Sequence, residues 1–291
     1  VAEKIGDSKR ASNYRREAEA ARLAINTLAW DGNWYARGTT DAGRWFGISA
    51  DKEGKIFLNA QSWAMICGAA DTPERIKTCI KSVNKHLMTS CGPMTMSPAF
   101  TSMREDIGKI TQKTPGTNEN GSVYSHAAAF YAYGLFRARQ ADEGFRVLRM
   151  LLTGAGSNPL SRSQQLPLYL PNFYRGIACG KTAGRASGHW GTGTCAWYYR
   201  TVVTELLGVC AEFDGLRIDP QLPKSWNQAA LWREFMGAQF TISIRRSDAV
   251  SMTQVSLDGQ VLPDNLIPAQ KAGGKHAVQV LVPNPALPEP N

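Results

Sequence analysis

Residues 113–126 read K-T-P-G-T-N-E-N-G-S-V-Y-S-H and connect a long polar loop to an apolar segment that is expected to form a helix over 126–141. The same order, a long loop that ends where a helix begins, recurs through the first two-thirds of the chain. It predicts helical hairpins separated by two unusually long loops, 91–125 and 153–192. Loops of this length in a compact domain often carry function.

Several other segments have the apolar spacing of helices. Between Arg10 and Ala29, apolar residues recur every three or four positions and form one stripe. The run Asp71-Thr72-Pro73-Glu74 offers a cap, a proline in the first turn and an acid near the positive helix end, so it predicts a helix start. Helices are also expected over 59–70, 143–152 and 193–209.

The character of the sequence changes near residue 212. Two later segments alternate apolar and polar residues, which is typical of strands. The apolar positions are Phe240, Ile242 and Ile244 in one segment and Val278, Val280 and Val282 in the other. The expected fold is therefore mainly α with a β C-terminal domain, divided into residues 1–210 and 211–291.

Composition restricts the class of protein. The chain has 291 residues, of which 43% are hydrophobic and 20% charged, as in a soluble globular protein. No apolar run approaches the ~20 residues that cross a bilayer. The six cysteines form no CxxC pair, and the first residues lack a signal-peptide core. These features predict buried reduced thiols and a cytoplasmic location.

The net charge of +9 leaves three partners open: nucleic acid, an acidic membrane surface, or an anionic small substrate. The basic residues are scattered and form no arginine-rich stripe, which argues against nucleic acid. A mildly basic surface without specific meaning is the plainer interpretation. We expect neither a nucleic acid nor a membrane as partner.

The loop before the helix at 126 carries several polar side chains close together. Asn118, Glu119, Asn120 and His126 offer the amide, carboxylate and imidazole groups that suit a hydroxyl-rich ligand. The alternative is an ordinary polar turn that precedes a helix capped by Ser125.

A second loop offers an anion site. Gly191-Thr192-Gly193-Thr194 opens a helix, so its free backbone N–H groups face outward, and glycine allows close approach. Arg185 and His189 lie just upstream. The alternative is a flexible glycine loop in which a threonine caps the helix.

A third candidate is a pair of cations. Lys109 and Lys113 are four residues apart, so one side of a helical turn would present both to an anion, unless they belong to a solvated basic face. No motif for a nucleotide, a catalytic metal or a nucleophilic serine is present. We therefore expect no metal and no cofactor.

Five segments together resemble the inverting disaccharide phosphorylases of glycoside hydrolase family 94. They are WDGNWYARGTTDAG (30–43), IFLNAQSWA (56–64), PGTNENGSVYSH (115–126), WGTGTCAWYYR (190–200) and DGLRIDPQLP (214–223), and they occur in the family's order across nearly the whole chain. DIGKITQKTPG and LPNFYRG followed by TAGR are most similar to members that act on cellobionic acid. Members acting on cellobiose, chitobiose or β-1,2-glucans, including the C-terminal region of cyclic glucan synthases, are the near alternatives.

The resemblance implies a fold and a reaction. The fold is a portion of an (α/α)6 toroid followed by a small β-sandwich-like domain, in a homodimer. The reaction is reversible phosphorolysis of a β-linked glucosyl disaccharide, with inversion, to α-glucose 1-phosphate and gluconate or another acceptor. Inorganic phosphate is a substrate, and no second carboxylate is required as a base.

The resemblance also assigns residues. It places phosphate at His126, Thr192 and Gly193, and the acceptor at Lys109 and Lys113. Members that take neutral sugars have an acid and a tyrosine at these two acceptor positions, whereas two cations suit a carboxylate-bearing acceptor. Acid-specific members carry arginine at position 109, so Lys109 keeps the charge but loses the bidentate geometry.

The family's general acid is an aspartate in a D-W-N-D segment that this chain does not contain, so the resemblance implies an acid upstream of Val1 in a missing N-terminal portion. Asp31, Glu119 and Arg185 remain as possible parts of the substrate wall. Two other functions stay open. One is a hydrolase that uses two carboxylates such as Asp31 and Glu119, and the other is a non-catalytic carbohydrate- or nucleic-acid-binding module.

Overall fold

The computed structural model describes residues 1–154, 156, 158–188, 192–269 and 273–285. The chain forms two compact units, Val1–Tyr199 and Arg200–Asn291, so the division lies earlier than the expected one at 210/211. Each unit is described by itself.

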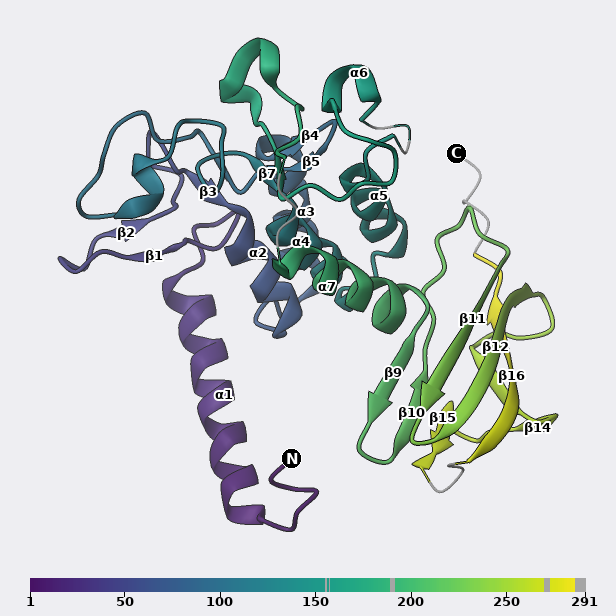
Figure 1. The fold of residues 1–291 in the computed structure, drawn as a ribbon. Coiled ribbons are helices and arrows are strands. Elements are labelled where there is room, and N and C mark those ends of the chain that lie inside the picture. The colour runs from purple at the N-terminus through teal and green to yellow at the C-terminus, as the bar shows by residue number, and fades with distance from the viewer. Residues whose placement is uncertain (155, 157, 189–191, 270–272, 286–291) are drawn as a thin grey trace, which may run out of the picture. The chain divides into compact units, whose positions relative to one another are not determined.

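The first unit is built on helices. They are α1 (Ser8–Leu28), α2 (Leu58–Ile66), α3 (Pro73–His86), α4 (Ser125–Arg137), α5 (Ala141–Leu151), the short α6 (Leu160–Ser163) and α7 (Thr192–Arg200). Helix α4 contacts both α2 and α5 and is almost completely buried (Figure 1). Small residues allow this packing: a Cβ added to Gly134 of α4 would lie 3.0 Å from the carbonyl oxygen of Ser62 on α2.

The start of α3 confirms the sequence prediction. The Thr72 side chain accepts a hydrogen bond from the backbone N–H of Arg75, and Pro73 and Glu74 occupy the first turn. Behind this start, Cys79 and Val83 are completely buried. The six cysteines, all of which the structure describes, form no disulfide; Cys79 and Cys91 are buried as expected, whereas Cys67 and Cys195 are exposed.

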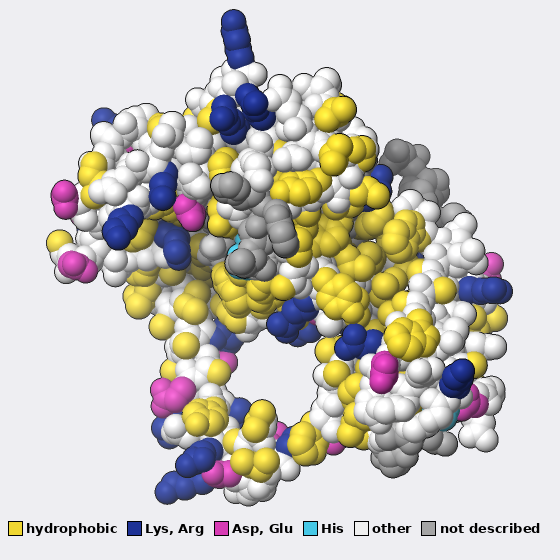
Figure 2. Space-filling model, in the orientation of Figure 1, with side chains coloured by type: hydrophobic (Ala, Val, Ile, Leu, Met, Phe, Trp, Pro, Cys, Tyr) yellow, Lys and Arg dark blue, Asp and Glu magenta, His cyan; other side chains and the backbone are white. Residues whose placement is uncertain are grey.

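Helix α1 forms where its spacing predicts, but its apolar stripe is not buried. Ala11 is its one buried residue, whereas Leu23 and Leu28 are 53% and 65% exposed. In Figure 1 the helix extends away from the other helices of its unit, and Figure 2 shows hydrophobic and charged side chains interspersed along it. No helix among the described residues is long and apolar enough to cross a membrane.

Short two-residue strands tie the long loops to the helical framework. The pairs are β1 (Gly38–Thr39) with β2 (Trp45–Phe46), β3 (Ile56–Phe57) with β6 (Met96–Ser97), β4 (Met88–Thr89) with β5 (Gly92–Pro93), and β7 (Val123–Tyr124) with β8 (Phe173–Tyr174). Two 3₁₀ turns, Lys109–Gln112 and Ile177–Thr182, lie within the loops. The β7–β8 pair joins the two long loops directly before α4, and so fixes where that helix starts.

The second unit contains two sheets. One has the order β15-β10-β9, with β9 (Val209–Glu212), β10 (Gly215–Ile218) and β15 (Leu266–Pro268). The other has the order β11-β12-β16-β13-β14, with β11 (Gln228–Phe235), β12 (Ala238–Ser247), β13 (Gln254–Leu257), β14 (Gln260–Val261) and β16 (Gly274–Pro283). Strands β12 and β16 run parallel, and the other pairs are antiparallel.

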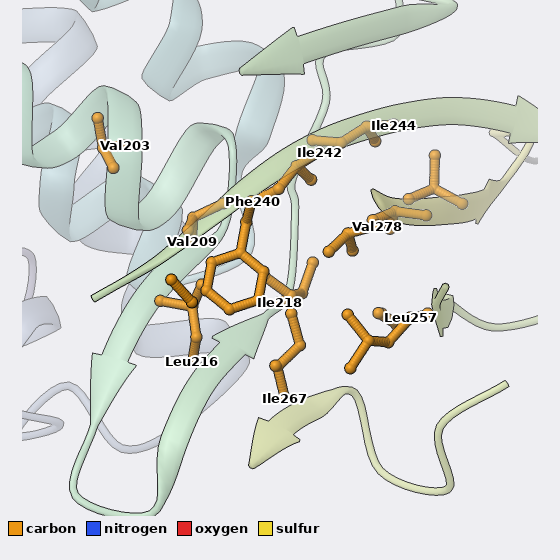
Figure 3. Packing of buried hydrophobic residues seen from close by; sticks show 14 of the residues in the cluster. Val203, Val209, Leu216, Ile218, Phe240, Ile242, Ile244, Leu257, Ile267 and Val278 are labelled. Carbon is orange, nitrogen blue, oxygen red and sulfur yellow. The ribbon is translucent and has the colours of Figure 1, made fainter. Parts of the chain in front are cut away.

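The alternating segments of the sequence form β12 and β16, as expected. Their register pairs Ile242 with Val278 and Ile244 with Val280, so the apolar residues of both strands face the same side. Together with Leu216, Ile218, Ile267 and others they form one hydrophobic cluster to which both sheets contribute (Figure 3). Because period-two alternation puts every second side chain on one face, this unit follows directly from the sequence pattern.

The helix expected over 193–209 is interrupted. Regular α-helix ends at Arg200, a π-helical turn follows over Thr201–Leu206, and Gly208 has a φ of +65°. A Cβ at Gly208 would also collide with the backbone of Asp219 and Pro220, so the position requires glycine on two counts. The chain then enters β9.

Candidate functional site

The first unit contains a cavity of about 170 Å³ where the starts of α2 and α4 meet the long loop 91–125. Its polar lining comes from elements far apart in the sequence. The lining residues are Arg37, Phe57, Asn59, Thr95, Ile110, Glu119, Tyr124, His126, Ala127 and Phe130. The second loop, 153–192, reaches this region through β8 and the start of α7.

His126 is the central polar group of this cavity. Because Tyr124 is held in extended conformation by the β7–β8 pair, His126 falls in the first turn of α4. Its Nε2 atom is buried and has no hydrogen-bond partner in the part of the chain that the structure describes. Burial lowers the pKa of His126 below its ordinary value, so the imidazole is neutral at pH 7. A buried polar atom without a partner indicates that a ligand or water completes the site.

Gly193, near the start of α7, lies directly against His126. A Cβ built on this glycine would fall 2.6 Å from Nδ1 and 2.8 Å from Nε2 of the imidazole. The first turn of α7 therefore lies closer to the ring than it could with any residue other than glycine at position 193. The free N–H groups of a helix start favour an anion at this position.

Of the other residues expected at this end of α7, Thr192 is its first residue, and its side chain lies outside the described atoms. His189 and Gly191 also lie outside the described residues. The structure therefore brings together two of the three residues expected at a phosphate site, His126 and Gly193.

In the polar loop before α4, Asn120 follows the alternative interpretation, that of an ordinary polar turn. Asn120 is completely buried, and its side chain is used internally: it accepts from Phe100 N–H at 2.8 Å and donates to the carbonyl oxygens of Phe100 and Lys113 at 2.9 and 2.7 Å. Asn118 takes a left-handed φ of +46° and does not line the cavity. Of Asn118, Glu119 and Asn120, only Glu119 lines the cavity, so the two asparagines do not contribute to its described lining.

The two candidate cations do not share a helical face. Lys109 begins a 3₁₀ turn and Lys113 follows it in extended conformation, so the α-helical spacing that would align them is absent. Both side chains are exposed, and neither lines the cavity. Ile110, between them, does line it, which places this turn at the cavity's edge.

Two further expectations find no support at the cavity. The Asp31 carboxylate accepts the backbone N–H of Ser49 at 2.5 Å, and Asp31 does not line the cavity. Arg185 is exposed and is also absent from the lining. Ser125 does not cap α4: Tyr124 precedes the helix, and Ser125 Oγ is buried without a partner among the described residues.

Arg37 and Asn59 line the cavity although neither was expected from the sequence. Arg37 is the only lysine or arginine among the described lining residues, and its guanidinium lies 5.9 Å from the ring centroid of Phe57. Asn59, in the first turn of α2, has a buried Oδ1 without a partner in the described structure. The one feature that could have identified them is that they lie in segments 30–43 and 56–64, which carry the family resemblance. Nothing in the local sequence indicates that these residues meet His126.

No group of three histidine, cysteine or acidic side chains among the described residues has the geometry of a metal site. The cavity instead combines a neutral imidazole, one guanidinium and one carboxylate, and the start of α7 lies against the imidazole. This set suits a ligand with both an anionic group and hydroxyls.

Comparison with known proteins identifies relatives of the whole chain. Residues 1–208 match the family model described as the glycosyl hydrolase 94 superfamily, catalytic domain. Cellobionic acid phosphorylase of Neurospora crassa is 41% identical over 286 residues, which cover 97% of this chain and 36% of that protein. A 3-O-β-D-glucopyranosyl-β-D-glucuronide phosphorylase of Paenibacillus borealis is 34% identical, with 96% and 36% covered.

The chain spans about a third of the length of these curated relatives. Among solved structures, a sialidase aligns with a TM-score of 0.53 at 16% identity, covering 79% of this chain and 20% of the sialidase. That likeness concerns the fold alone.

Proposed function

The chain belongs to the glycosyl hydrolase 94 superfamily, and we propose that it forms part of an inverting disaccharide phosphorylase whose phosphate site lies beside the contact of His126 with Gly193. The observation that carries the proposal is the close approach of a neutral, unpartnered imidazole to the N-terminal turn of a helix. A phosphate oxygen would accept a hydrogen bond from the imidazole, and others would accept from the N–H groups at the start of α7.

The proposed reaction transfers a glucosyl unit to inorganic phosphate. A phosphate oxygen forms a bond to the anomeric carbon while the bond from that carbon to the leaving oxygen breaks. A carboxylic acid gives its proton to the leaving oxygen, and the products are α-glucose 1-phosphate and the free acceptor. Because phosphate is already an anionic nucleophile, the chemistry needs no general base.

We assign the general acid to a part of the protein outside this chain. Glu119 is the only carboxylate among the described lining residues, and Asp31 is occupied by the Ser49 backbone. The relatives are about three times as long as this chain, so they have room for such an acid elsewhere. Loss of a general acid typically costs about 10²–10⁴-fold in rate, so the chain alone should turn over very slowly.

Arg37 supplies the charge that the neutral imidazole does not. Bringing a phosphate into a partly buried cavity beside Glu119 is costly unless a cation compensates. Arg37 is the one fixed positive charge among the described lining residues. A charge-assisted hydrogen bond from its guanidinium contributes about 1.5–3 kcal/mol.

The acceptor in our proposal is gluconate, released from cellobionic acid. It is supported by the 41% identity to the Neurospora crassa cellobionic acid phosphorylase and by the exposed Lys109 and Lys113 beside the cavity-lining Ile110. The two lysines would attract the carboxylate as separate point charges, since they do not share a helical face.

We also propose the larger assembly that the resemblance implies: a portion of an (α/α)6 toroid followed by a β-sandwich-like domain, within a cytoplasmic homodimer. The free cysteines and the two core-sharing sheets of the second unit are consistent with this proposal.

The experiment is phosphorolysis of cellobionic acid and of cellobiose by the natural full-length protein, with glucose 1-phosphate as the measured product. We expect product from cellobionic acid, strong preference over cellobiose, and loss of activity in His126→Gln. Release of free glucose without phosphate would instead indicate a hydrolase. Equal turnover of both disaccharides would remove the role of Lys109 and Lys113.

A further inference from the structure

We propose that Phe130 is a positioning residue that holds the His126 imidazole against the start of α7. The consequence for phosphate rests on the proposed function above, whereas the effect on the imidazole does not. Phe130 lines the cavity but has no polar atom, so its effect on phosphate would pass through the His126 imidazole.

Helices α4 and α7 meet at two successive contacts, one helical turn apart on each helix. His126 and Phe130 are four residues apart on α4, and their ring centroids lie 4.5 Å apart at an interplanar angle of 50°. Gly193 and Trp197 are likewise four apart on α7. Gly193 meets His126, and the Trp197 ring meets Phe130 edge-on at 4.6 Å and 89°.

Phe130 therefore links the helix that carries the imidazole to the helix that carries the glycine. A third ring from α2 supports it, since Trp63 lies 5.3 Å from Phe130. The Phe130–Trp197 pair is edge-to-face, a preferred geometry that stabilises by more than the buried area alone. The aromatic contact fixes the register in which Gly193 reaches His126, because one turn of helix separates the two contacts on each side.

The same ring shields the imidazole from water. Besides His126, the titratable groups among the described lining residues are Arg37, Glu119 and Tyr124, and none of them comes from the α4–α7 contact. Replacing Phe130 leaves those groups in place and opens the side of the imidazole that the phenyl ring covers. The burial that keeps His126 neutral is thus reduced without any change in neighbouring charge.

The test compares three variants of the natural full-length protein. Phe130→Leu removes the ring, Phe130→Tyr keeps it, and Phe136→Leu makes the same change at a completely buried position of the same helix. The pKa of His126 is measured by NMR with histidine-selective ¹³C labelling, and the signal is assigned by its absence in His126→Gln. The steady-state KM for phosphate and kcat are measured in parallel.

We expect Phe130→Leu to raise the pKa of His126 towards the ordinary value of about 6.5, and to raise KM for phosphate about tenfold. Phe130→Tyr should keep both near the wild-type values. Phe136→Leu should lower thermal stability but leave the pKa of His126 unchanged. An unchanged pKa in Phe130→Leu, or an equal shift in Phe136→Leu, would overturn the proposal.

The two proposals fail in different ways. The pKa of His126 is measured in phosphate-free buffer, so it reports on Phe130 whatever the ligand is. If the pKa shifts in Phe130→Leu but phosphate never perturbs His126, the proposed function fails and the positioning role stands. If phosphate perturbs the His126 signal equally in wild type and Phe130→Leu, and the pKa of His126 is the same in both proteins, the positioning role fails and the proposed function stands.

Discussion

His126 and Gly193 lie so close together that a Cβ on the glycine would fall 2.6 Å from Nδ1 of the imidazole. The two residues come from the starts of different helices, α4 and α7, and are 67 positions apart in the sequence. Their contact places an unpartnered buried nitrogen beside free helix N–H groups. The predictions that follow depend on this contact and on the cavity around it.

Gly193→Ala should displace the imidazole or the first turn of α7, since both cannot keep their places. We expect phosphate binding to weaken at least tenfold, because a shift of about 1 Å in a binding group is enough for such a loss. Isothermal titration calorimetry with inorganic phosphate measures the change. Gly188→Ala is the matched control, because a Cβ there meets nothing within 4 Å. Equal binding by both variants would contradict the assignment of Gly193.

Arg37→Ala should raise KM for phosphate, because it removes the only lysine or arginine side chain among the described lining residues of the cavity. The expected loss of about 1.5–3 kcal/mol corresponds to roughly ten- to hundredfold in KM. Arg37→Lys should recover part of the loss, since it keeps the charge but not the fork geometry. Arg16→Ala, at an exposed position of α1, is the control. A KM for phosphate that stays the same in Arg37→Ala would exclude this role.

Asn120→Ala should destabilise the first unit rather than change ligand affinity directly. The substitution leaves a buried N–H and two carbonyl oxygens without their partner, at a cost of about 2–4 kcal/mol. Thermal or urea unfolding measures the loss. Asn118→Gly should be nearly neutral, because its φ of +46° suits glycine. Stability unchanged in Asn120→Ala would show that this side chain is available for a ligand after all.

The stability of the first unit should fall as the pH drops below about 7. Burial lowers the pKa of His126, and burial followed by the neighbouring Lys85 and Lys55 lowers that of His86. Since both values lie below the unfolded value of about 6.5, the unfolded chain binds more protons in this range. The contribution of the two neutral imidazoles to the free energy of unfolding is therefore fully present above pH 7. It is lost as the pH falls towards the pKa values of the folded state.

Urea unfolding at pH 7.5, 6.5 and 5.5 measures this slope. Between pH 7.5 and 5.5, His126→Gln should lose less of its free energy of unfolding than the wild type. The loss that is due to His86 should remain. A slope that does not change in His126→Gln would mean that His126 is not desolvated.

Local signals in the sequence predict much of the fold. The cap, proline and acid at 72–74 specify where α3 begins, and strict alternation specifies β12 and β16 and their shared face. Both kinds of signal act within a few residues. The location of α1 was predictable for the same reason, but the exposure of its apolar stripe was not, because burial depends on what packs against it.

The site was less predictable because tertiary contacts build it. Local chemistry indicated His126 and Gly193 only as separate features of two loops, and it was the family resemblance that placed both at one phosphate site; the fold shows that the two residues are in contact. Arg37 and Asn59 join the cavity from segments with no local chemical pattern. The role of Asn120 stayed open because an amide that stabilises a loop and an amide that binds a ligand look alike in sequence; the structure supports the first interpretation. The expected pairing of Lys109 and Lys113 failed because the turn is 3₁₀ rather than α-helical.

The most direct measurement is the NMR signal of His126 during titration with inorganic phosphate. We expect a saturable shift of this signal in the wild type and little or none in Gly193→Ala. A His126 signal that stays constant at phosphate concentrations that support glucose 1-phosphate formation would contradict this expectation.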